Sequence, residues 1–193
     1  MHRVGQQAAA RESAWRALQE PDGCVLLLGP RGVGKTQLAI ELSLQAARKG
    51  LTRFPGSQMY RVLAELFRDE KRTFGASEGQ RVTPIDRASD VGLLVLDEIQ
   101  ERFESAWEDR ELTMLFDRRY RDMRRTILLA NLTVVDAPKR LPASMWSRIV
   151  ECGVVIECNW PSFRGGAEVT LDGAVPDVST RKSDPDVDCS AID

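Results

Sequence analysis

The segment CVLLLGPRGVGKTQLAIEL, from Cys24 to Leu42, constrains the fold more than any other part of the chain. A short apolar run leads into the pattern GxxxxGKT, and a helical pattern from Lys35 to about Arg48 follows it. A strand, a glycine-rich turn and a helix N-terminus in this order form a cradle for phosphate groups. A glycine-rich turn with an incidental lysine is the weaker interpretation, because it does not explain the flanking elements. The segment therefore predicts a nucleoside triphosphate, ATP, as ligand.

The residues of the cradle have separate chemical tasks. Its three glycines permit positive φ and carry no Cβ, so backbone N–H groups can turn toward phosphate oxygens. We expect Lys35 to reach the β- and γ-phosphates and the Thr36 hydroxyl to ligate Mg²⁺. The predicted nucleotide-binding set in this segment is Gly29, Pro30, Arg31, Gly32, Val33, Gly34, Lys35, Thr36 and Gln37.

Two further apolar runs, 91–96 and 126–130, end in polar side chains. Short apolar runs are typical of central strands in a parallel sheet, whose carboxyl ends meet at the edge where such folds bind ligands. We expect Asp97 to hold Mg²⁺ through water, Glu98 to polarise the attacking water, and Asn131 to contact the γ-phosphate and orient that water. A solvated acidic pair and a turn-forming asparagine are the alternatives. The order of the three motifs along the chain favours the catalytic roles.

Helical and apolar segments alternate along the chain, which predicts an α/β fold: a three-layer P-loop NTPase with a central parallel sheet. Besides the elements above, we expect helices over 5–20, 57–71 and 108–123, strands over 51–54 and 154–160, and a loop with one short helical piece over 73–89. We divide the chain into an N-terminal helix (1–22), an ATPase core (23–164) and a tail (165–193).

Charge and composition separate the tail from the rest. Residues 165–193 carry seven acidic and two basic side chains, a balance of −5 against −2 for the whole chain. Their Gly, Pro, Ser and Asp content predicts disorder. The 193 residues, 42% hydrophobic, suffice for one domain core, and the sequence has neither an 18-residue apolar run nor a signal peptide. We expect a cytoplasmic protein without membrane contact, with reduced cysteines.

Taken together, the motifs resemble those of the DnaC/IstB group of AAA+ ATPases, specifically the DnaC-type helicase loaders of bacteria and phages. The matching segments are LLLGPRGVGKTQLA, LLVLDEIQ, FDRRYRDMRRTILLANL, LPASMWSRIVECG and ECNWPSFRG. The resemblance spans roughly Ala9 to Gly165. It implies an AAA+ core without a separate helical lid, which hydrolyses ATP as a homo-oligomer on single-stranded DNA and acts on a replicative helicase.

Further roles follow from the resemblance by position. Arg148 in WSRI matches the arginine finger that completes the active site of a neighbouring subunit, which is worth roughly 10³ to 10⁵ in rate. Arg164 in SFRG matches the terminal Ser-x-Arg and is expected to contact nucleotide or close the domain. Arg119 and Tyr120 are expected to belong to the helix that packs at the subunit seam, with Tyr120 in a packing role. About twenty residues precede the first strand, so we expect the N-terminal domain with which full-length loaders grip the helicase to be lacking.

Two basic clusters are candidates for DNA contact. Arginine side chains could neutralise phosphates, although such clusters also complement a helix C-terminus or an acidic partner subunit. No aromatic-rich stacking platform is evident beside either cluster, which disfavours sequence-specific binding. The first cluster is Arg118, Arg119, Arg121, Arg124 and Arg125, and the second is Lys71, Arg72, Arg81 and Arg87.

Three alternatives to a helicase loader remain open. An IstB-like transposition helper is the nearest. A small P-loop phosphotransferase needs an arginine-bearing lid and an acceptor pocket, which the Asn131 and SRI segments do not supply. A nucleotide-dependent adaptor without hydrolysis is disfavoured by Glu98, which completes a hydrolytic set.

Overall fold

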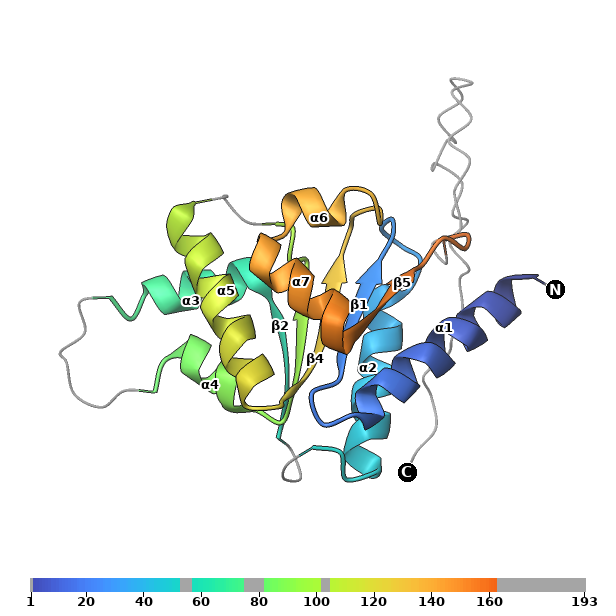
Figure 1. Ribbon diagram of the computed structural model, residues 1–193, viewed down its shortest axis with the longest axis horizontal. Helices are drawn as coiled ribbons and strands as arrows, with labels where there is room; N and C mark the ends of the chain where they lie inside the picture. Colours follow the sequence, from blue (N-terminus) through green and yellow to red (C-terminus); the bar gives the residue numbers. More distant parts are fainter. Residues whose placement is uncertain (1, 53–56, 75–81, 102–104, 163–193) are drawn as a thin grey trace, which may run out of the picture.

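The computed structural model describes residues 2–52, 57–74, 82–101 and 105–162. Helices and strands alternate along these residues for most of their length (Figure 1). The elements are α1 (His2–Gln19), β1 (Cys24–Leu28), α2 (Lys35–Arg48), β2 (Gln58–Val62), α3 (Leu63–Lys71), α4 (Pro84–Asp90), β3 (Leu93–Asp97), α5 (Ala106–Arg121), β4 (Arg125–Ala130), α6 (Ala137–Arg140), α7 (Ala143–Cys152) and β5 (Gly153–Glu157).

The five strands form one parallel sheet in the order β2-β3-β4-β1-β5. Leu28, the last residue of β1, lies opposite Ala130, the last residue of β4. Leu96 of β3 lies opposite Leu128 of β4. The carboxyl ends of the three central strands therefore meet at one edge, which places the residues that follow them side by side.

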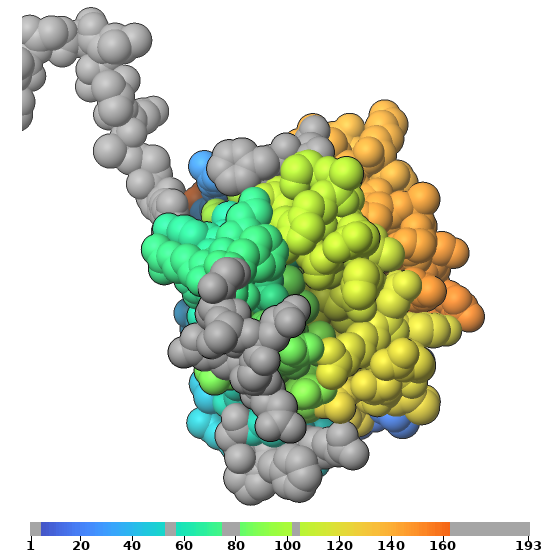
Figure 2. Space-filling view, turned by 90° about the vertical axis from the view of Figure 1, so that its left-hand side faces the viewer, coloured from blue at the N-terminus to red at the C-terminus, as the bar shows by residue number. Residues whose placement is uncertain are grey.

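Both faces of the sheet are buried. Leu26 and Leu28 of β1 point to one face, where they pack with residues of α3, α4, α5, α6 and α7. Val25 and Leu27 point to the other face, where α1 and α2 supply the partners. Figure 2 shows α3, α5 and α7 side by side on the outside of the first face. A strand buried on both faces needs no alternation of polar residues, which explains the continuous apolar run of β1. The predicted three-layer α/β fold is confirmed.

One predicted element is wrong in its first half. The periodicity over 57–71 predicts a single helix, but residues 58–62 form the edge strand β2 and only Leu63–Lys71 is helical. β2 pairs with β3 from Gln58 opposite Leu93 to Val62 opposite Asp97. This pairing, which no local pattern reveals, overrides the helical spacing.

Other predicted segments can be compared with the structure. Leu51 and Thr52 are not in a strand, and the rest of the predicted strand 51–54 lies outside the described residues. The short helical piece expected within 73–89 is α4. Arg164 and the tail 165–193 also lie outside the described residues. Among the described helices, none combines the length and the apolar character needed to cross a bilayer.

Candidate nucleotide-binding site

The turn between β1 and α2 has the conformation that its glycines permit. Gly29, Gly32 and Gly34 have φ values of 139°, 85° and 90°. A Cβ on Gly29 would lie 2.4 Å from the carbonyl oxygen of Cys158, so only glycine fits there. Gly34 is the N-cap of α2, in the left-handed region. The free N–H groups at the start of α2 therefore face the turn, as a phosphate cradle requires.

Lys35 crosses the mouth of this turn. Its side chain is buried, with the residue only 6% exposed, and its Nζ donates to the carbonyl oxygens of Gly29 at 2.7 Å and Pro30 at 2.8 Å. The third acceptor is the Asn131 amide oxygen, at 2.8 Å. Burial lowers the pKa of the Lys35 ammonium, while the nearby Asp97 carboxylate opposes that shift. The lysine is thus held between the ends of β1 and β4.

Asp97, the last residue of β3, receives hydrogen bonds on both carboxylate oxygens. Its Oδ2 accepts from the Thr36 hydroxyl and from the Tyr60 hydroxyl, each at 2.8 Å. Its Oδ1 accepts from the backbone N–H of Glu98 at 2.7 Å. A hydroxyl and a carboxylate side by side at the edge of a polar cleft are the oxygen ligands that Mg²⁺ prefers. The residues present therefore fit a magnesium ion that accompanies a nucleotide.

The chain turns sharply after β3. Glu98 has φ of 54°, a left-handed conformation that costs free energy for a non-glycine residue and is common at functional sites. Two residues later, the Gln100 side chain accepts from the backbone N–H of Asn131 at 3.0 Å. This contact ties the segment after β3 to the end of β4.

Most of the predicted catalytic and phosphate-binding residues line one cleft of about 510 Å³. The lining residues are Arg31, Gly32, Gly34, Lys35, Thr36, Asp97, Glu98 and Asn131. Arg31 also donates to Glu101 at 3.0 Å. The cleft thus combines two cations, two carboxylates, a hydroxyl and an amide, which are groups suited to phosphoryl transfer to water.

Arg148 is not part of this cleft. It lies on α7, where it forms an ion pair with Asp117 of α5 and lies over the Tyr120 ring, 5.5 Å from the ring centroid. Asp117 and Tyr120 both lie on α5, the helix that the family resemblance places at a subunit seam. The structure therefore places Arg148 outside its own chain's phosphate cleft, on the surface shared by α5 and α7.

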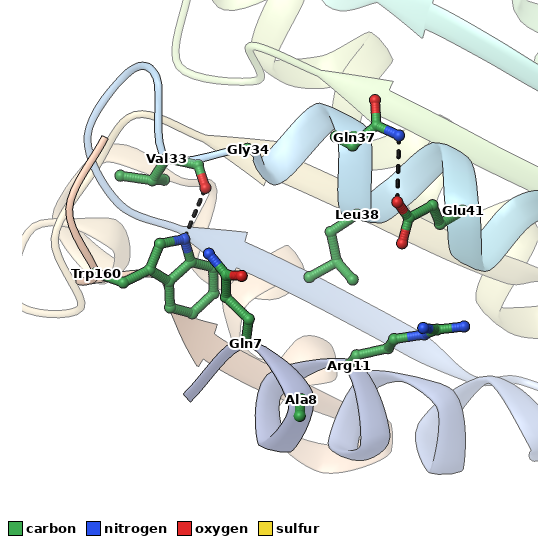
Figure 3. A pocket seen from close by; sticks show the side chains of 9 residues that line it. All are labelled: Gln7, Ala8, Arg11, Val33, Gly34, Gln37, Leu38, Glu41 and Trp160. Carbon is green, nitrogen blue, oxygen red and sulfur yellow. Dashed lines mark hydrogen bonds between the residues drawn. The ribbon is translucent and has the colours of Figure 1, made fainter. Parts of the chain in front are cut away.

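A second pocket, of about 560 Å³, opens between α1 and α2 on the other side of Gly34. The Trp160 indole N–H donates to the Val33 carbonyl oxygen at 2.7 Å, which fixes the ring against the phosphate cradle. Figure 3 shows the Gln7 amide beside this ring, and its buried Nε2 has no hydrogen-bond partner. The residues that line the pocket are Gln7, Ala8, Arg11, Val33, Gly34, Gln37, Leu38, Glu41 and Trp160.

Of the residues that line this second pocket, only Val33, Gly34 and Gln37 belong to the predicted nucleotide-binding set. Gln7 and Arg11 lie on a helix that has no motif, and their approach to α2 depends on tertiary packing. Trp160 lies in the segment ECNWPSFRG, which is part of the family resemblance, so this resemblance was the sequence signal that could have pointed to a role for Trp160. Tyr60 and Gln100, which contact Asp97 and Asn131, are likewise absent from the predicted site residues.

Several arginines of the first basic cluster, at the end of α5 and the start of β4, contact groups of their own chain. Arg118 pairs with Asp86 at 2.9 Å and with Asp90 at 3.3 Å. Arg125 donates to the backbone oxygens of Leu18 and Leu51. The Arg118 guanidinium thus joins α5 to α4, whereas the Arg125 guanidinium joins β4 to the end of α1 and to the segment after α2.

Arg119 of the same cluster is buried in the interior, since the residue is only 1% exposed. It donates to the Thr126 hydroxyl at 2.9 Å and to four backbone carbonyl oxygens, those of Ala88, Ser89, Val91 and Arg125. The Arg119 side chain therefore does not reach the surface and cannot itself contact a neighbouring subunit. Its role is to satisfy carbonyl groups where α4, α5 and β4 meet.

The second basic cluster has a different environment. Lys71 pairs with Glu108 at 2.9 Å, and its Nζ lies 4.9 Å from the centroid of the Trp107 ring. Phe74, 59% exposed, contacts the same ring edge to face. Arg72 and Arg87 are exposed, and Arg81 lies outside the described residues. One exposed aromatic ring, that of Phe74, therefore lies beside Lys71 of this cluster.

Comparisons with known proteins agree with this architecture. A family model described as "IstB-like ATP binding protein" matches residues 11–165. The replicative helicase loader DnaC of Escherichia coli strain K12 is 28% identical over 165 residues, which cover 82% of this chain and 64% of DnaC. The chain thus spans less than two thirds of the length of the curated relatives it matches.

Solved structures show the same core. A crystal structure of DnaI, 23% identical, has a TM-score of 0.63 and matches 82% of this chain and 84% of its own. A crystal structure of the DnaC helicase loader, 20% identical, has a TM-score of 0.61 and matches 80% and 86%. These likenesses show that the chain has the same α/β fold as these two proteins. Because the family model spans most of the sequence and the cleft has the matching geometry, the chain belongs to the family of IstB-like ATP-binding proteins.

Proposed function

We propose that this protein hydrolyses ATP with Mg²⁺ and acts as a DNA replication ATPase of the helicase-loader type. One observation carries the proposal: Lys35, the Thr36–Asp97 pair, Glu98 and Asn131 line a single cleft at the carboxyl edge of the sheet. A nucleotide-binding adaptor would need only the first of these groups. Hydrolysis requires in addition a carboxylate and an amide, which Glu98 and Asn131 supply in the cleft.

The two pockets that share Gly34 accommodate the two ends of ATP. The phosphates occupy the polar cleft, where Lys35 and the N–H groups of α2 neutralise their charge. The nucleoside occupies the more apolar pocket beside Trp160, where the unpartnered Gln7 amide offers a donor to the base. A bound Mg²⁺ would be held by Thr36 and Asp97 and would supply positive charge to the phosphate oxygens.

Hydrolysis uses the residues at the ends of β3 and β4. Glu98 accepts the proton of the attacking water, and Asn131 orients that water and contacts the γ-phosphate. Because Lys35 already donates to the Asn131 oxygen, the amide nitrogen is the group left to donate to phosphate. Arg164 contacts nucleotide or closes the domain in this proposal, as in the matched motif.

Arg148 acts in a neighbouring subunit. Its position on α7, away from its own cleft, supports delivery in trans, and a homo-oligomer follows. In this arrangement residues 23–164 are the ATPase domain, 1–22 the leading helix and 165–193 an acidic tail.

Single-stranded DNA and a replicative helicase are the proposed partners. The exposed Phe74 ring, with Arg72 and Arg87 nearby in the chain, offers base stacking and phosphate contact without sequence readout. The match to DnaC, a protein named for replicative helicase loading, supports the helicase. The IstB-like family description supports a second candidate, a helper ATPase in transposition.

ATP turnover measured with and without single-stranded DNA tests the proposal, with Glu98→Gln as the hydrolysis-deficient control. We expect DNA to stimulate turnover of the unmodified protein and to leave the variant inactive. A protein that binds Mg-ATP but turns it over only with a small acceptor molecule would be a phosphotransferase instead. Capture of a replicative helicase rather than a transposase by the purified protein separates the two candidate functions.

A further inference from the structure

Tyr60 lies beside the magnesium-binding residues although it belongs to none of the sequence motifs. It is the middle residue of β2 and pairs with Val95 of β3. Asp97 is two residues further along β3 and therefore points to the same face of the sheet. A tyrosine is long enough to reach such a diagonal neighbour, and its hydroxyl lies 2.8 Å from Asp97 Oδ2.

This hydroxyl completes a set of three donors on one carboxylate. Thr36 and Tyr60 donate to Oδ2, and the Glu98 N–H donates to Oδ1. The Thr36 hydroxyl is itself the expected ligand of Mg²⁺, and the Glu98 N–H belongs to the backbone. Of these three donors, Tyr60 is therefore the side chain left with the orientation of the Asp97 carboxylate as its polar role. Groups of this kind commonly change metal affinity without touching the metal.

The exposure of Tyr60 argues against a purely structural role. The residue is 44% exposed on an edge strand, and it belongs to neither hydrophobic cluster of the core. The strand does not depend on it for register, since β2 pairs with β3 along its whole length. The feature that distinguishes Tyr60 from any other edge residue is its contact with Asp97.

We propose that Tyr60 is a positioning residue for the magnesium ion that accompanies ATP. It holds the Asp97 carboxylate in the rotamer in which Oδ2 faces Thr36, so that the hydroxyl and the carboxylate act together on one hydrated ion. The inference rests on the proposed function, because it requires Mg-ATP as ligand.

The test is the Mg²⁺ dependence of nucleotide binding in Tyr60→Phe, which removes only the hydroxyl. Calorimetric titration with a non-hydrolysable ATP analogue is carried out in EDTA and over a series of Mg²⁺ concentrations. We expect the affinity in EDTA to match that of the unmodified protein and the gain in affinity from Mg²⁺ to fall by about tenfold, the lower end of the effect of such partners. Thr113→Val is the matched control, because it also removes one hydroxyl, which donates to the Asp109 carbonyl oxygen within α5, and it should leave the Mg²⁺ dependence unchanged.

The outcomes are distinguishable. If Tyr60→Phe keeps the full gain from Mg²⁺, or loses affinity equally in EDTA and Mg²⁺, Tyr60 does not position the metal site. If the unmodified protein binds no Mg-ATP, the proposed function itself fails, and the inference fails with it. Thermal unfolding without nucleotide checks the fold of the variant, and Tyr60→Met, which also lacks the hydroxyl, replaces it if the phenylalanine variant is unfolded.

Discussion

The Lys35 ammonium and the Asn131 amide oxygen, 96 residues apart in the chain, lie 2.8 Å from each other. The contact joins the phosphate cradle after β1 to the end of β4, across two neighbouring strands of the sheet. The same lysine donates to two carbonyl oxygens of the cradle. A γ-phosphate that enters the cleft therefore meets a lysine and an asparagine whose positions depend on each other.

Removal of the lysine should abolish nucleotide binding. In Lys35→Ala the cleft loses its buried cation, and the carbonyl oxygens that it contacts are left to face phosphate oxygens of like charge. Fluorescence titration with a labelled ATP analogue measures the effect. Lys49→Ala, at the exposed C-terminal end of the same helix, is the control and should bind normally. Binding by Lys35→Ala within threefold of the unmodified protein would contradict the assignment.

Removal of the asparagine should separate binding from hydrolysis. In Asn131→Ala, Lys35 retains its two backbone acceptors, so we expect ATP affinity to stay within a few-fold. The turnover number should fall by about 10² to 10³, the usual effect of losing one donor aimed at the reacting group. Single-turnover measurements at saturating ATP check this split. An unchanged turnover number would reduce Asn131 to a structural contact of Lys35.

Arg119 should matter for stability rather than for DNA binding or assembly. Arg119→Met leaves four backbone carbonyl oxygens and the Thr126 hydroxyl without their donor in the interior. Leaving one buried acceptor unsatisfied costs about 1 to 3 kcal/mol, so we expect a loss of at least this size when several acceptors lose their donor. Urea unfolding measures the loss. Arg121→Met is the matched control, because its side chain is 73% exposed and should change stability by about 0.5 kcal/mol or less.

The phosphate cradle could be predicted from sequence because its chemistry is local. Lys35 and Thr36 follow the glycines directly, and the turn, the strand and the helix lie within one short segment. Asp97 and Asn131 could be placed beside them because each ends an apolar run, and parallel strands end at a common edge. The three-layer fold follows from the same runs.

The parts that could not be predicted depend on contacts between distant segments. Tyr60 stands in a stretch with helical spacing, and only its pairing with β3 makes it a strand residue facing Asp97. Arg119 is one of five arginines that are alike in sequence, and only the meeting of α4 with β4 buries it. Gln7 comes to the second pocket because α1 packs on α2.

Arg148 should act in a neighbouring subunit, and mixing two inactive variants tests this directly. Arg148→Ala retains a complete cleft and should bind ATP but lose about 10³-fold or more in turnover. Lys35→Ala should bind no ATP but still carries Arg148 on α7, held by Asp117 and Tyr120. In a mixed oligomer the arginine of one variant can reach the nucleotide of the other, so the mixture should regain part of the activity that neither variant has alone.

Two control variants test whether the rescue depends on Arg148. Glu98→Gln in place of Lys35→Ala should rescue equally, since its Arg148 is also intact, whereas the double variant Lys35→Ala, Arg148→Ala should not rescue. If Arg148→Ala alone is fully active in the assembled state, or if the double variant rescues as well as Lys35→Ala, delivery of this arginine between subunits is wrong.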